Sequence, residues 1–286
     1  SPRYVSGTYL AGGMKMSRVG VWSRVSKLRS QGIVIEAARN RGYRLAEEPT
    51  LLNQNLLDAH LDALRQAQAA GIPHMILLSA ICVQKPQLAF QKAKLAFEHS
   101  LIASGIDYSI VRPTAFFKSL SGQVERVRQG KPFVMFGDGT LTACKPISDG
   151  DLAAYLADCI DNPERRNRIL PIGGPGPAIT PRMQGEALFA MLGQPPRFKH
   201  VPVALLDAIV LMLGTIGRVV PSLRAKAELA RIGRYYATES MLVLNPETGL
   251  YDAEATPSTG SETLFDYYAQ LLSGEAQAER GEHAVF

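Results

Sequence analysis

Two short, almost wholly apolar segments constrain the fold of this chain more than any other feature. Residues 74–79 (HMILLS) and 108–111 (YSIV) have the length of strands, and their lack of an alternating polar face is typical of parallel strands covered on both sides. Residues 85–103 between them have the length and composition of a long helix. A strand, a helix and a strand in this order predict a right-handed βαβ unit, and therefore an α/β fold.

This unit corresponds to the second half of a larger type of domain. Dinucleotide-binding α/β domains begin with a strand, a glycine-rich turn and a helix whose N-terminus meets the diphosphate. Residues 1–60 supply no such start, because Gly7, Gly12 and Gly13 follow no apolar strand and Gly20 falls inside a predicted helix. We therefore predict an incomplete Rossmann-like domain with a C-terminal substrate subdomain.

The missing start has two physical consequences. Losing two charge-assisted hydrogen bonds to a diphosphate would cost ~3–6 kcal/mol, or roughly a hundredfold to ten-thousandfold in affinity. Missing sheet strands would also leave an apolar edge exposed. Any activity that depends on a dinucleotide is therefore predicted to be weakened or lost.

Charge is distributed unevenly along the chain. The first 60 residues carry nine Lys or Arg against four acidic residues, and the rest carries 22 of each. Such asymmetry indicates a segment that can bind a polyanion, joined to a neutral body. The three cysteines form no CxxC pair, which indicates reduced thiols in a cytoplasmic compartment and argues against a structural zinc site.

The basic start has the element order of a winged helix. Residues 18–30 place Val21 and Val25 on one helical face, and Ser17 stands where an N-cap is expected. Residues 33–45 contain a β-branched run, a basic turn and a second short run, which predict a hairpin. We interpret residues 1–58 as a partial winged helix-turn-helix and residues 59–286 as a separate, truncated reductase domain.

Within that start, residues 16–22 (MSRVGVW) and 41–45 (RGYRL) resemble the N-terminal DNA-binding domain of biotin operon repressors. The resemblance implies a helix in the major groove and a wing against the DNA backbone. By that resemblance the helix residues facing DNA are Arg18, Ser23 and Lys27, and the wing residues meeting phosphates are Arg39 and Arg41. The alternative is a basic, solvated helix and hairpin with no role in DNA binding.

The body resembles the atypical branch of the short-chain dehydrogenase/reductase superfamily. Ser79 ends a predicted strand, Lys94 lies on the following helix, and a Val-Arg-Pro-Thr run follows the next strand. In that superfamily a tyrosine four residues before the lysine donates a proton, but this chain has Phe90 there. Carbonyl reduction by a phenolic acid is therefore disfavoured.

A more specific resemblance extends from about residue 61 to residue 286. Six separate blocks, in order, are similar to the divinyl chlorophyllide 8-vinyl reductases: residues 77–86, 90–94, 112–120, 136–139, 143–149 and 171–177. Members of that family use NADPH to reduce the 8-vinyl group of divinyl chlorophyllide or protochlorophyllide to ethyl, a step in chlorophyll and bacteriochlorophyll synthesis. Because the macrocycle can delocalise the charge formed between hydride and proton transfer, loss of the tyrosine is tolerable in that chemistry.

The resemblance also implies the site residues. Lys94 would hold the nicotinamide ribose or supply catalytic positive charge, Ser79 would lie near the nicotinamide, and Pro113 and Thr114 would pack on its carboxamide side. The neighbouring aromatics Phe116 and Phe117 are either walls for a flat pigment or ordinary core residues. Apart from the resemblance, a lysine at position 94 is equally typical of the exposed face of an amphipathic helix.

Three further patterns have simpler interpretations. Residues 173–177 (GGPGP) include prolines that lack phosphate-binding N–H groups, so we predict a turn bordering the substrate cleft. Asp149 and Asp151 stand at a predicted helix start, where carboxylates favour the helix dipole. Residues 201–220 are the most apolar stretch, but they contain Asp207 and Arg218, so a buried helix or one lying on the photosynthetic membrane is favoured over a spanning one.

Two functions from different classes remain open. The first is NADPH-dependent 8-vinyl reduction, and it predicts NADPH oxidation coupled to loss of the vinyl signal. The alternative is a DNA-binding regulator whose degenerate reductase body senses a tetrapyrrole, and it predicts salt-sensitive DNA binding. We interpret the region of residues 57–62 as a join between a winged-helix start and a reductase remainder.

Overall fold

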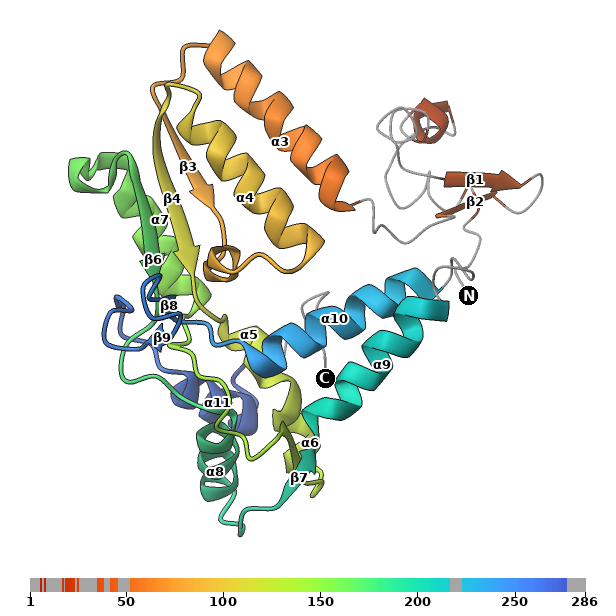
Figure 1. Cartoon of the computed structure of the whole chain (residues 1–286), viewed down its shortest axis with the longest axis vertical. Helices are drawn as coiled ribbons and strands as arrows, with labels where there is room; N and C mark the ends of the chain where they lie inside the picture. Colours follow the sequence, from red (N-terminus) through yellow and green to blue (C-terminus); the bar gives the residue numbers. More distant parts are fainter. Residues whose placement is uncertain are drawn as a thin grey trace.

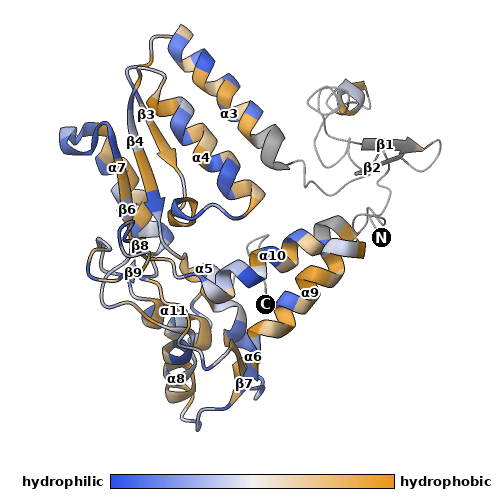
Figure 2. Cartoon of the chain, viewed as in Figure 1, coloured by the Kyte–Doolittle hydropathy of each residue, from blue (hydrophilic) through white to orange (hydrophobic). Residues whose placement is uncertain are grey.

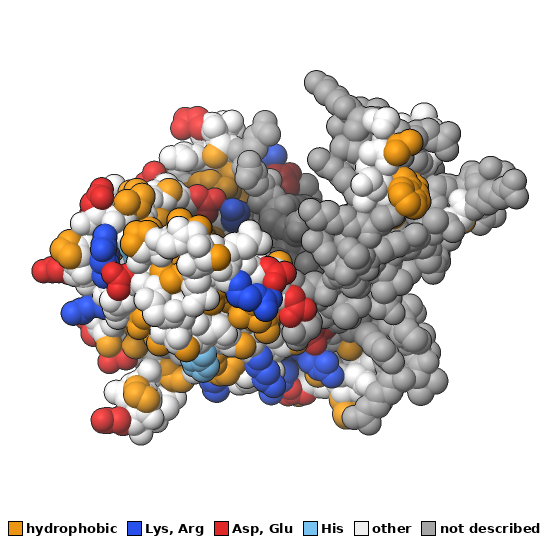
Figure 3. Space-filling view, turned by 90° about the horizontal axis from the view of Figure 1, so that it is seen from above, with side chains coloured by type: hydrophobic (Ala, Val, Ile, Leu, Met, Phe, Trp, Pro, Cys, Tyr) orange, Lys and Arg blue, Asp and Glu red, His pale blue; other side chains and the backbone are white. Residues whose placement is uncertain are grey.

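The computed structural model describes residues 6, 8, 17, 19–23, 25, 35–38, 42–45, 52–216 and 223–276. Figure 1 shows a small sheet with helices against it, followed by a C-terminal part built mainly of helices. In Figure 3, positive and negative side chains are interspersed over the described surface. This agrees with the balanced charge of the body.

The basic N-terminal segment contains the predicted helix and hairpin where it is described. Residues 19–23 and 25 are helical, Val21 and Val25 are buried, and the Ser17 hydroxyl accepts a hydrogen bond from the Gly20 N–H at 3.1 Å. Strand β1 (Ile35–Ala38) pairs antiparallel with β2 (Gly42–Leu45). Ser23 is exposed. The other residues predicted to contact DNA lie outside the described residues: Arg18, Lys27, Arg39 and Arg41.

The predicted βαβ unit forms two neighbouring strands of a three-stranded sheet. Strands β3 (His74–Leu78), β4 (Asp107–Pro113) and β6 (Arg168–Ile172) lie parallel in the order β3-β4-β6, with α4 (Ala89–Ile102) between the first two in sequence. The helix before β3 is α3 (Leu52–Ala69). After a 3-10 turn, η1 (Ile81–Gln84), the α4 helix begins later than predicted because Lys85 precedes Pro86 and has a non-helical backbone.

Helices cover both faces of this sheet. Leu77 and Ile110 contact a cluster that includes residues of α3 and α4, whereas Ile76 and Val111 contact one that includes α7 (Asp149–Asp161). Neighbouring residues in a strand point to opposite faces, so apolar side chains at successive positions are needed. This is why the strands show no polar alternation in the sequence.

Strand β3 lies at one end of the sheet among the described residues. It pairs with β4 alone, its first four residues are only half-buried, and Leu78 is 43% exposed. The two inner residues of β4, Ile110 and Val111, are fully buried. The contrast agrees with the predicted apolar edge.

The elements β5, β7 to β9, α5, α6 and α8 to α11 form a second part of the chain, which we call the C-terminal part. It packs against the ends of the sheet strands. Its parallel pair consists of β5 (Phe133–Phe136) and β7 (Phe198–Val201), and a short antiparallel pair consists of β8 (Val243–Leu244) and β9 (Tyr251–Asp252). The remaining elements are α5 (Phe117–Leu120), η2 (Ser121–Gln123), α6 (Val124–Arg128), η3 (Pro163–Arg165), α8 (Pro181–Met191), α9 (Val203–Ile216), α10 (Arg224–Thr238) and α11 (Leu264–Ser273). The largest apolar cluster of the chain joins this part to η1.

Helix α7 begins at Asp149, as Asp149 and Asp151 predict, and the side chain that caps it is that of Ser148. The Ser148 hydroxyl accepts from the Asp151 N–H at 2.9 Å, and Asp149 pairs with Lys118 at 2.9 Å. The Asp151 carboxylate accepts from the backbone N–H groups of Ser261 and Glu262. Asp151 therefore also ties the C-terminal loop to α7.

The most apolar stretch of the chain forms an exposed helix. No residue of α9 is buried, and Leu205, Met212 and Ile216 are 51%, 52% and 42% exposed. Figure 2 shows α9 as a largely apolar helix beside α10. Within the described residues, no helix is long and apolar enough to cross a membrane.

A buried carboxylate joins the two sheet strands to α4. Glu98, on α4, is fully buried, and its two oxygens accept from the Arg112 guanidinium at the end of β4 and from the Ser79 hydroxyl after β3. The Arg112 side chain is 15% exposed. Removing one partner of such a pair leaves an uncompensated buried charge.

We therefore predict that Arg112→Leu lowers the free energy of unfolding by ~3–5 kcal/mol. The matched control is Arg166→Leu, because Arg166 pairs with Asp107 at 3.8 Å with both side chains more than 40% exposed. That pair should contribute less than ~1 kcal/mol. Urea denaturation followed by circular dichroism measures both, and equal losses in the two variants would contradict the structural role of Glu98.

Candidate functional site

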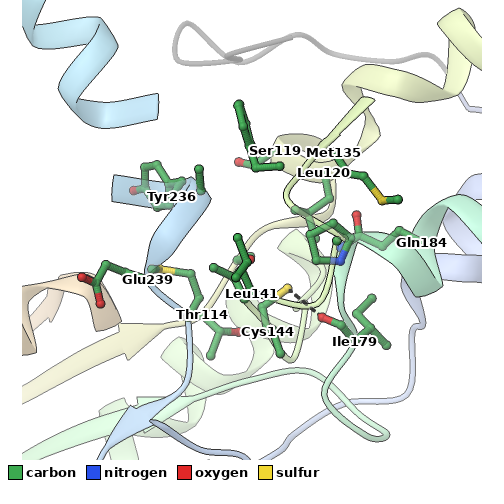
Figure 4. Close-up of a pocket in the computed structure, with 18 of the residues that line it drawn as sticks. Thr114, Ser119, Leu120, Met135, Leu141, Cys144, Ile179, Gln184, Tyr236 and Glu239 are labelled. Atoms are coloured by element: carbon green, nitrogen blue, oxygen red, sulfur yellow. Dashed lines mark hydrogen bonds between the residues drawn. The ribbon is translucent and has the colours of Figure 1, made fainter. Parts of the chain in front are cut away.

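A cavity of about 320 Å³ lies where the loops after β3 and β4 meet the C-terminal part of the chain. Its walls come from η1, from the segment after β4, from α5, β5 and α10, and from the loops around residues 139–144 and 179–184. Figure 4 shows Tyr236 and Glu239 on one side of it and Ser119, Leu120, Met135 and Gln184 on the other. Both halves of the chain are needed to enclose it.

The polar side chains of the cavity are mostly engaged with the protein itself. Thr114 donates its hydroxyl hydrogen to the Lys145 carbonyl, and Gln123 bonds both the N–H and the carbonyl of Val134 at 2.7 and 2.6 Å. Gln184 accepts from the Tyr268 hydroxyl at 3.4 Å. The described lining residues include no Lys or Arg and are mostly apolar, so the cavity suits an apolar group without negative charge.

The carboxylate of Glu239, also at the cavity, is fully paired. It accepts from Lys85 Nζ at 2.8 Å, from Gln87 at 3.1 Å and from the Tyr251 hydroxyl at 2.7 Å. Burial opposes the charge on Glu239, but these hydrogen bonds and the Lys85 charge outweigh it and hold its pKa below the usual range. Glu239 therefore fixes the end of α10 against the loop that follows η1.

A thiol and a phenol meet at the rim of the cavity. Cys82, on η1, is 3% exposed, and it lines the cavity together with Tyr236, on α10. Burial raises the Cys82 pKa, and this outweighs the opposing effects of the nearby Gln91 and Tyr236 side chains and of the Lys94 charge. Burial of its hydroxyl also raises the pKa of Tyr236, although 41% of the residue surface is exposed.

Some of the site residues predicted from the sequence line the cavity, and others do not. Pro113, Thr114 and Phe116 line the cavity. Ser79 lies one residue before the lining residue Ala80, but its hydroxyl donates to Glu98. Lys94 is not a lining residue either; burial lowers its pKa, while the charges of Cys82 and Glu98 act in the opposite direction.

The second of the two aromatics belongs to the core. Phe117 is 6% exposed, and its ring lies 5.7 Å from that of Tyr267, measured between centroids. The roles of all these residues toward a cofactor or pigment stay predictions.

The glycine- and proline-rich turn at 173–177 does not border the cavity as predicted. Gly173 and Gly174 are buried against the backbone of residues 145–147, where a Cβ on Gly174 would come within 1.9 Å of the Pro146 carbonyl oxygen. The turn is therefore a close backbone contact, and the cavity border lies further along the chain, at Ile179 and Pro181.

Sequence reasoning missed the contributions of α10. Tyr236 and Glu239 lie on a segment with no motif, and the Tyr235 hydroxyl that anchors it donates to the carbonyl of Cys82, 153 residues away, at 3.1 Å. The adjacent pair Tyr235-Tyr236 in an otherwise basic helix was the one signal available.

Comparison with known proteins connects this geometry to a family. Residues 26–163 match the family model described as NAD(P)H-binding, and residues 1–44 match the model described as an HTH domain. A relative from Oryza sativa subsp. indica, named divinyl chlorophyllide a 8-vinyl-reductase, chloroplastic, is 54% identical over 234 residues. The alignment covers 80% of this chain and 58% of the rice protein, so the chain spans little more than half the length of that relative.

The resemblance to the 8-vinyl reductases is confirmed. The N-terminal resemblance is confirmed as well, since the bifunctional ligase/repressor BirA of Bacillus subtilis is 35% identical over 52 residues, which are 18% of this chain and 16% of that protein. An NADPH-dependent quinone oxidoreductase from Escherichia coli has a TM-score of 0.54 at 18% identity, over 77% of this chain and 80% of that one. This likeness confirms the Rossmann-like fold.

The NAD(P)H-binding match implies a nicotinamide dinucleotide, and the cavity fits its flat, reacting end. Small apolar side chains, Ala80, Pro113 and Ala115, flank Thr114 where two parallel strands end, which is where ligands bind in open α/β sheets. The described residues include no glycine-rich turn leading from a sheet strand into a helix. The lining residues therefore fit the nicotinamide end, but the described residues offer no glycine-rich turn that could bind the diphosphate.

The three cysteines should differ in reactivity, and Cys144 at the cavity gives the clearest case. Burial raises the pKa of its thiol to about 12. At pH 8 only about one Cys144 in ten thousand would be a thiolate, which is the reactive form. We predict that iodoacetamide modifies Cys144 at least ~100-fold more slowly in the folded chain than in urea. Peptide mass spectrometry measures this, and similar rates in both conditions would contradict the burial of the thiol.

Proposed function

We propose that this chain binds the edge of a divinyl chlorophyllide or protochlorophyllide in the cavity between η1 and α10 and reduces its 8-vinyl group with NADPH. The observation that carries the proposal is the identity of 54% with the rice relative over 80% of this chain. The cavity supports it, because an apolar enclosure without Lys or Arg suits the uncharged, flat edge of a macrocycle.

The chemistry asks little of the protein at the reacting carbons. NADPH supplies a hydride when bound, and the ring system delocalises the charge that develops. The protein must exclude water, hold the two flat groups in contact and supply one proton. Pro113 and Thr114 are proposed to hold the nicotinamide end, and Phe116 is proposed to pack against the pigment.

Lys94 and Ser79 have a supporting role in this proposal. Both lie just behind the cavity wall, next to Cys82 and Ala80. Lys94 is proposed to supply positive charge to the reacting region, and Ser79, fixed by Glu98, is proposed to hold the turn that carries Ala80.

The test uses the full chain with divinyl protochlorophyllide and either NADPH or reduced nicotinamide mononucleotide, a donor that lacks the adenosine part. Both should convert the pigment to the monovinyl form, seen by its absorption, in proportion to loss of the donor's absorbance. NADPH should have lost most of its usual advantage over that donor, because the part of the chain that the structure describes contains no glycine-rich turn to bind the diphosphate.

Blocking the cavity should abolish the reaction. Ala80→Phe places a benzyl group in the cavity and should weaken pigment binding, measured by fluorescence quenching, at least ~10-fold. The matched control is Ala103→Phe at the exposed end of α4, which should leave binding unchanged. No conversion with either donor, or equal binding by the two variants, would overturn the proposal.

Contact with a membrane surface is a further part of this proposal. Leu205, Met212 and Ile216 repeat at helical spacing on α9, and all three are exposed. A helix with such a face can lie in the lipid interface. This position would bring the cavity close to an apolar pigment.

We predict that the chain cosediments with phosphatidylglycerol–phosphatidylcholine vesicles and that Met212→Asp weakens this at least ~10-fold. The matched control is Ile160→Asp, since Ile160 is 55% exposed on α7, away from α9. Equal sedimentation of the two variants would exclude α9 as the contact.

DNA contact through residues 1–45 is a second, separate proposal. It is supported by the HTH model match over residues 1–44 and by the 35% identity with the Bacillus subtilis ligase/repressor. The pigment reaction is proposed to be independent of it, because the described residues that line the cavity all lie between positions 80 and 241.

A further inference from the structure

Reduction of a vinyl group needs a proton, and the position that usually carries the proton donor holds a phenylalanine. Phe90 stands one helical turn before Lys94 on α4, where related reductases carry a tyrosine. Its ring is half-buried and packs against the largest apolar cluster. A proton donor must therefore come from another element.

Among the lining residues, few carry a proton acid enough to transfer. Thr114 donates its hydroxyl hydrogen to the Lys145 carbonyl, and the Cys144 thiol points to the Ile179 carbonyl at 3.9 Å. Ser119 and Thr142 are aliphatic alcohols, which are far weaker acids than a phenol. Tyr236 is the one phenol in the lining, and it reaches the cavity from α10.

Tyr236 shares the cavity wall with the Cys82 thiol. Both residues line the cavity, and the Tyr236 side chain and the Lys94 charge both act on that thiol. The neighbouring Tyr235 fixes α10 against η1, because its hydroxyl donates to the carbonyls of Cys82 and Lys85 at 3.1 and 3.3 Å. Cys82 is thus the group through which Tyr236, at the cavity, and Lys94, on α4, can exchange a proton.

We propose that Tyr236 is the proton donor of the 8-vinyl reduction, with the Cys82 thiol and Lys94 returning the proton to it. The inference rests on the proposed function. It assigns to the C-terminal part of the chain the role that a residue of α4 has in related reductases.

The atoms and electrons balance. The vinyl π bond is broken. One carbon forms a C–H bond with the hydride that NADPH supplies, using both electrons of the hydride. The other carbon forms a C–H bond with the phenolic proton of Tyr236, using the electron pair of the former π bond. The Tyr236 phenolate then receives the proton of the Cys82 thiol. The thiolate, next to the Lys94 ammonium, takes a proton from that group, and Lys94 recovers one from solvent.

The first arm of the test measures the reaction. Tyr236→Phe should slow vinyl reduction about 100-fold or more, the usual loss for a missing general acid, without weakening pigment binding more than about twofold. Adding Phe90→Tyr to Tyr236→Phe should recover at least ~10-fold, because it restores a phenol beside Lys94. The control is Tyr155→Phe, which should leave the rate unchanged, since Tyr155 lies on α7 and stacks on Arg165.

The second arm needs neither cofactor nor pigment. The groups that act on Cys82 are Lys94 and Gln91 from α4, Tyr235 and Tyr236 from α10, and Tyr251 from β9. Removing the Tyr236 hydroxyl should leave about tenfold less Cys82 thiolate at a fixed pH, because the phenol can no longer donate to the thiolate. The pH dependence of iodoacetamide labelling, resolved by peptide, measures it.

The two arms separate this inference from the proposed function. If the wild-type chain reduces no pigment, the proposed function fails, and the Cys82 labelling still decides whether the pair is coupled. An unchanged labelling profile in Tyr236→Phe, or a full reduction rate in that variant, would overturn the assignment of Tyr236. The predicted loss of rate with recovery by Phe90→Tyr, together with the shifted profile, would support it.

Discussion

The buried carboxylate of Glu98 organises the site. It accepts from the Ser79 hydroxyl and the Arg112 guanidinium, and so it ties α4 to the ends of two neighbouring parallel strands. Those two strand ends continue into η1 and into the Pro113–Thr114 segment, which both line the cavity. A charge this deep is stable only while both partners are present. The position of the cavity walls therefore depends on one ionic cluster that does not itself enter the cavity.

The C-terminal part completes what this cluster positions. Glu239 and Tyr235 hold α10 against η1 through Lys85, Gln87 and backbone carbonyls. Tyr236 is thereby brought to the rim of the cavity that Pro113 and Thr114 also line. The site is thus assembled across the boundary between the sheet and the C-terminal part.

Much of the fold could be predicted from local patterns. The strands at β3 and β4 and the start of α7 follow from apolar runs and from acidic residues that favour a helix N-terminus, which depend on neighbours in sequence. The Gly173–Gly174 pair was misplaced, because a close backbone contact and a cleft turn both call for glycine. Tyr236 and Glu239 could not be predicted, since their meaning depends on contacts with residues about 150 positions away. The sequence shows that position 90 lacks a tyrosine, but it does not indicate which other residue could donate the proton.

The most direct measurement is a structure of this chain with the monovinyl product bound. The account predicts that the edge of the macrocycle bearing the new ethyl group lies inside the cavity, between Thr114 and Tyr236, with the rest of the ring toward solvent. A pigment bound with that edge outside the cavity, or with Thr114 and Tyr236 on no common side of it, would contradict the account.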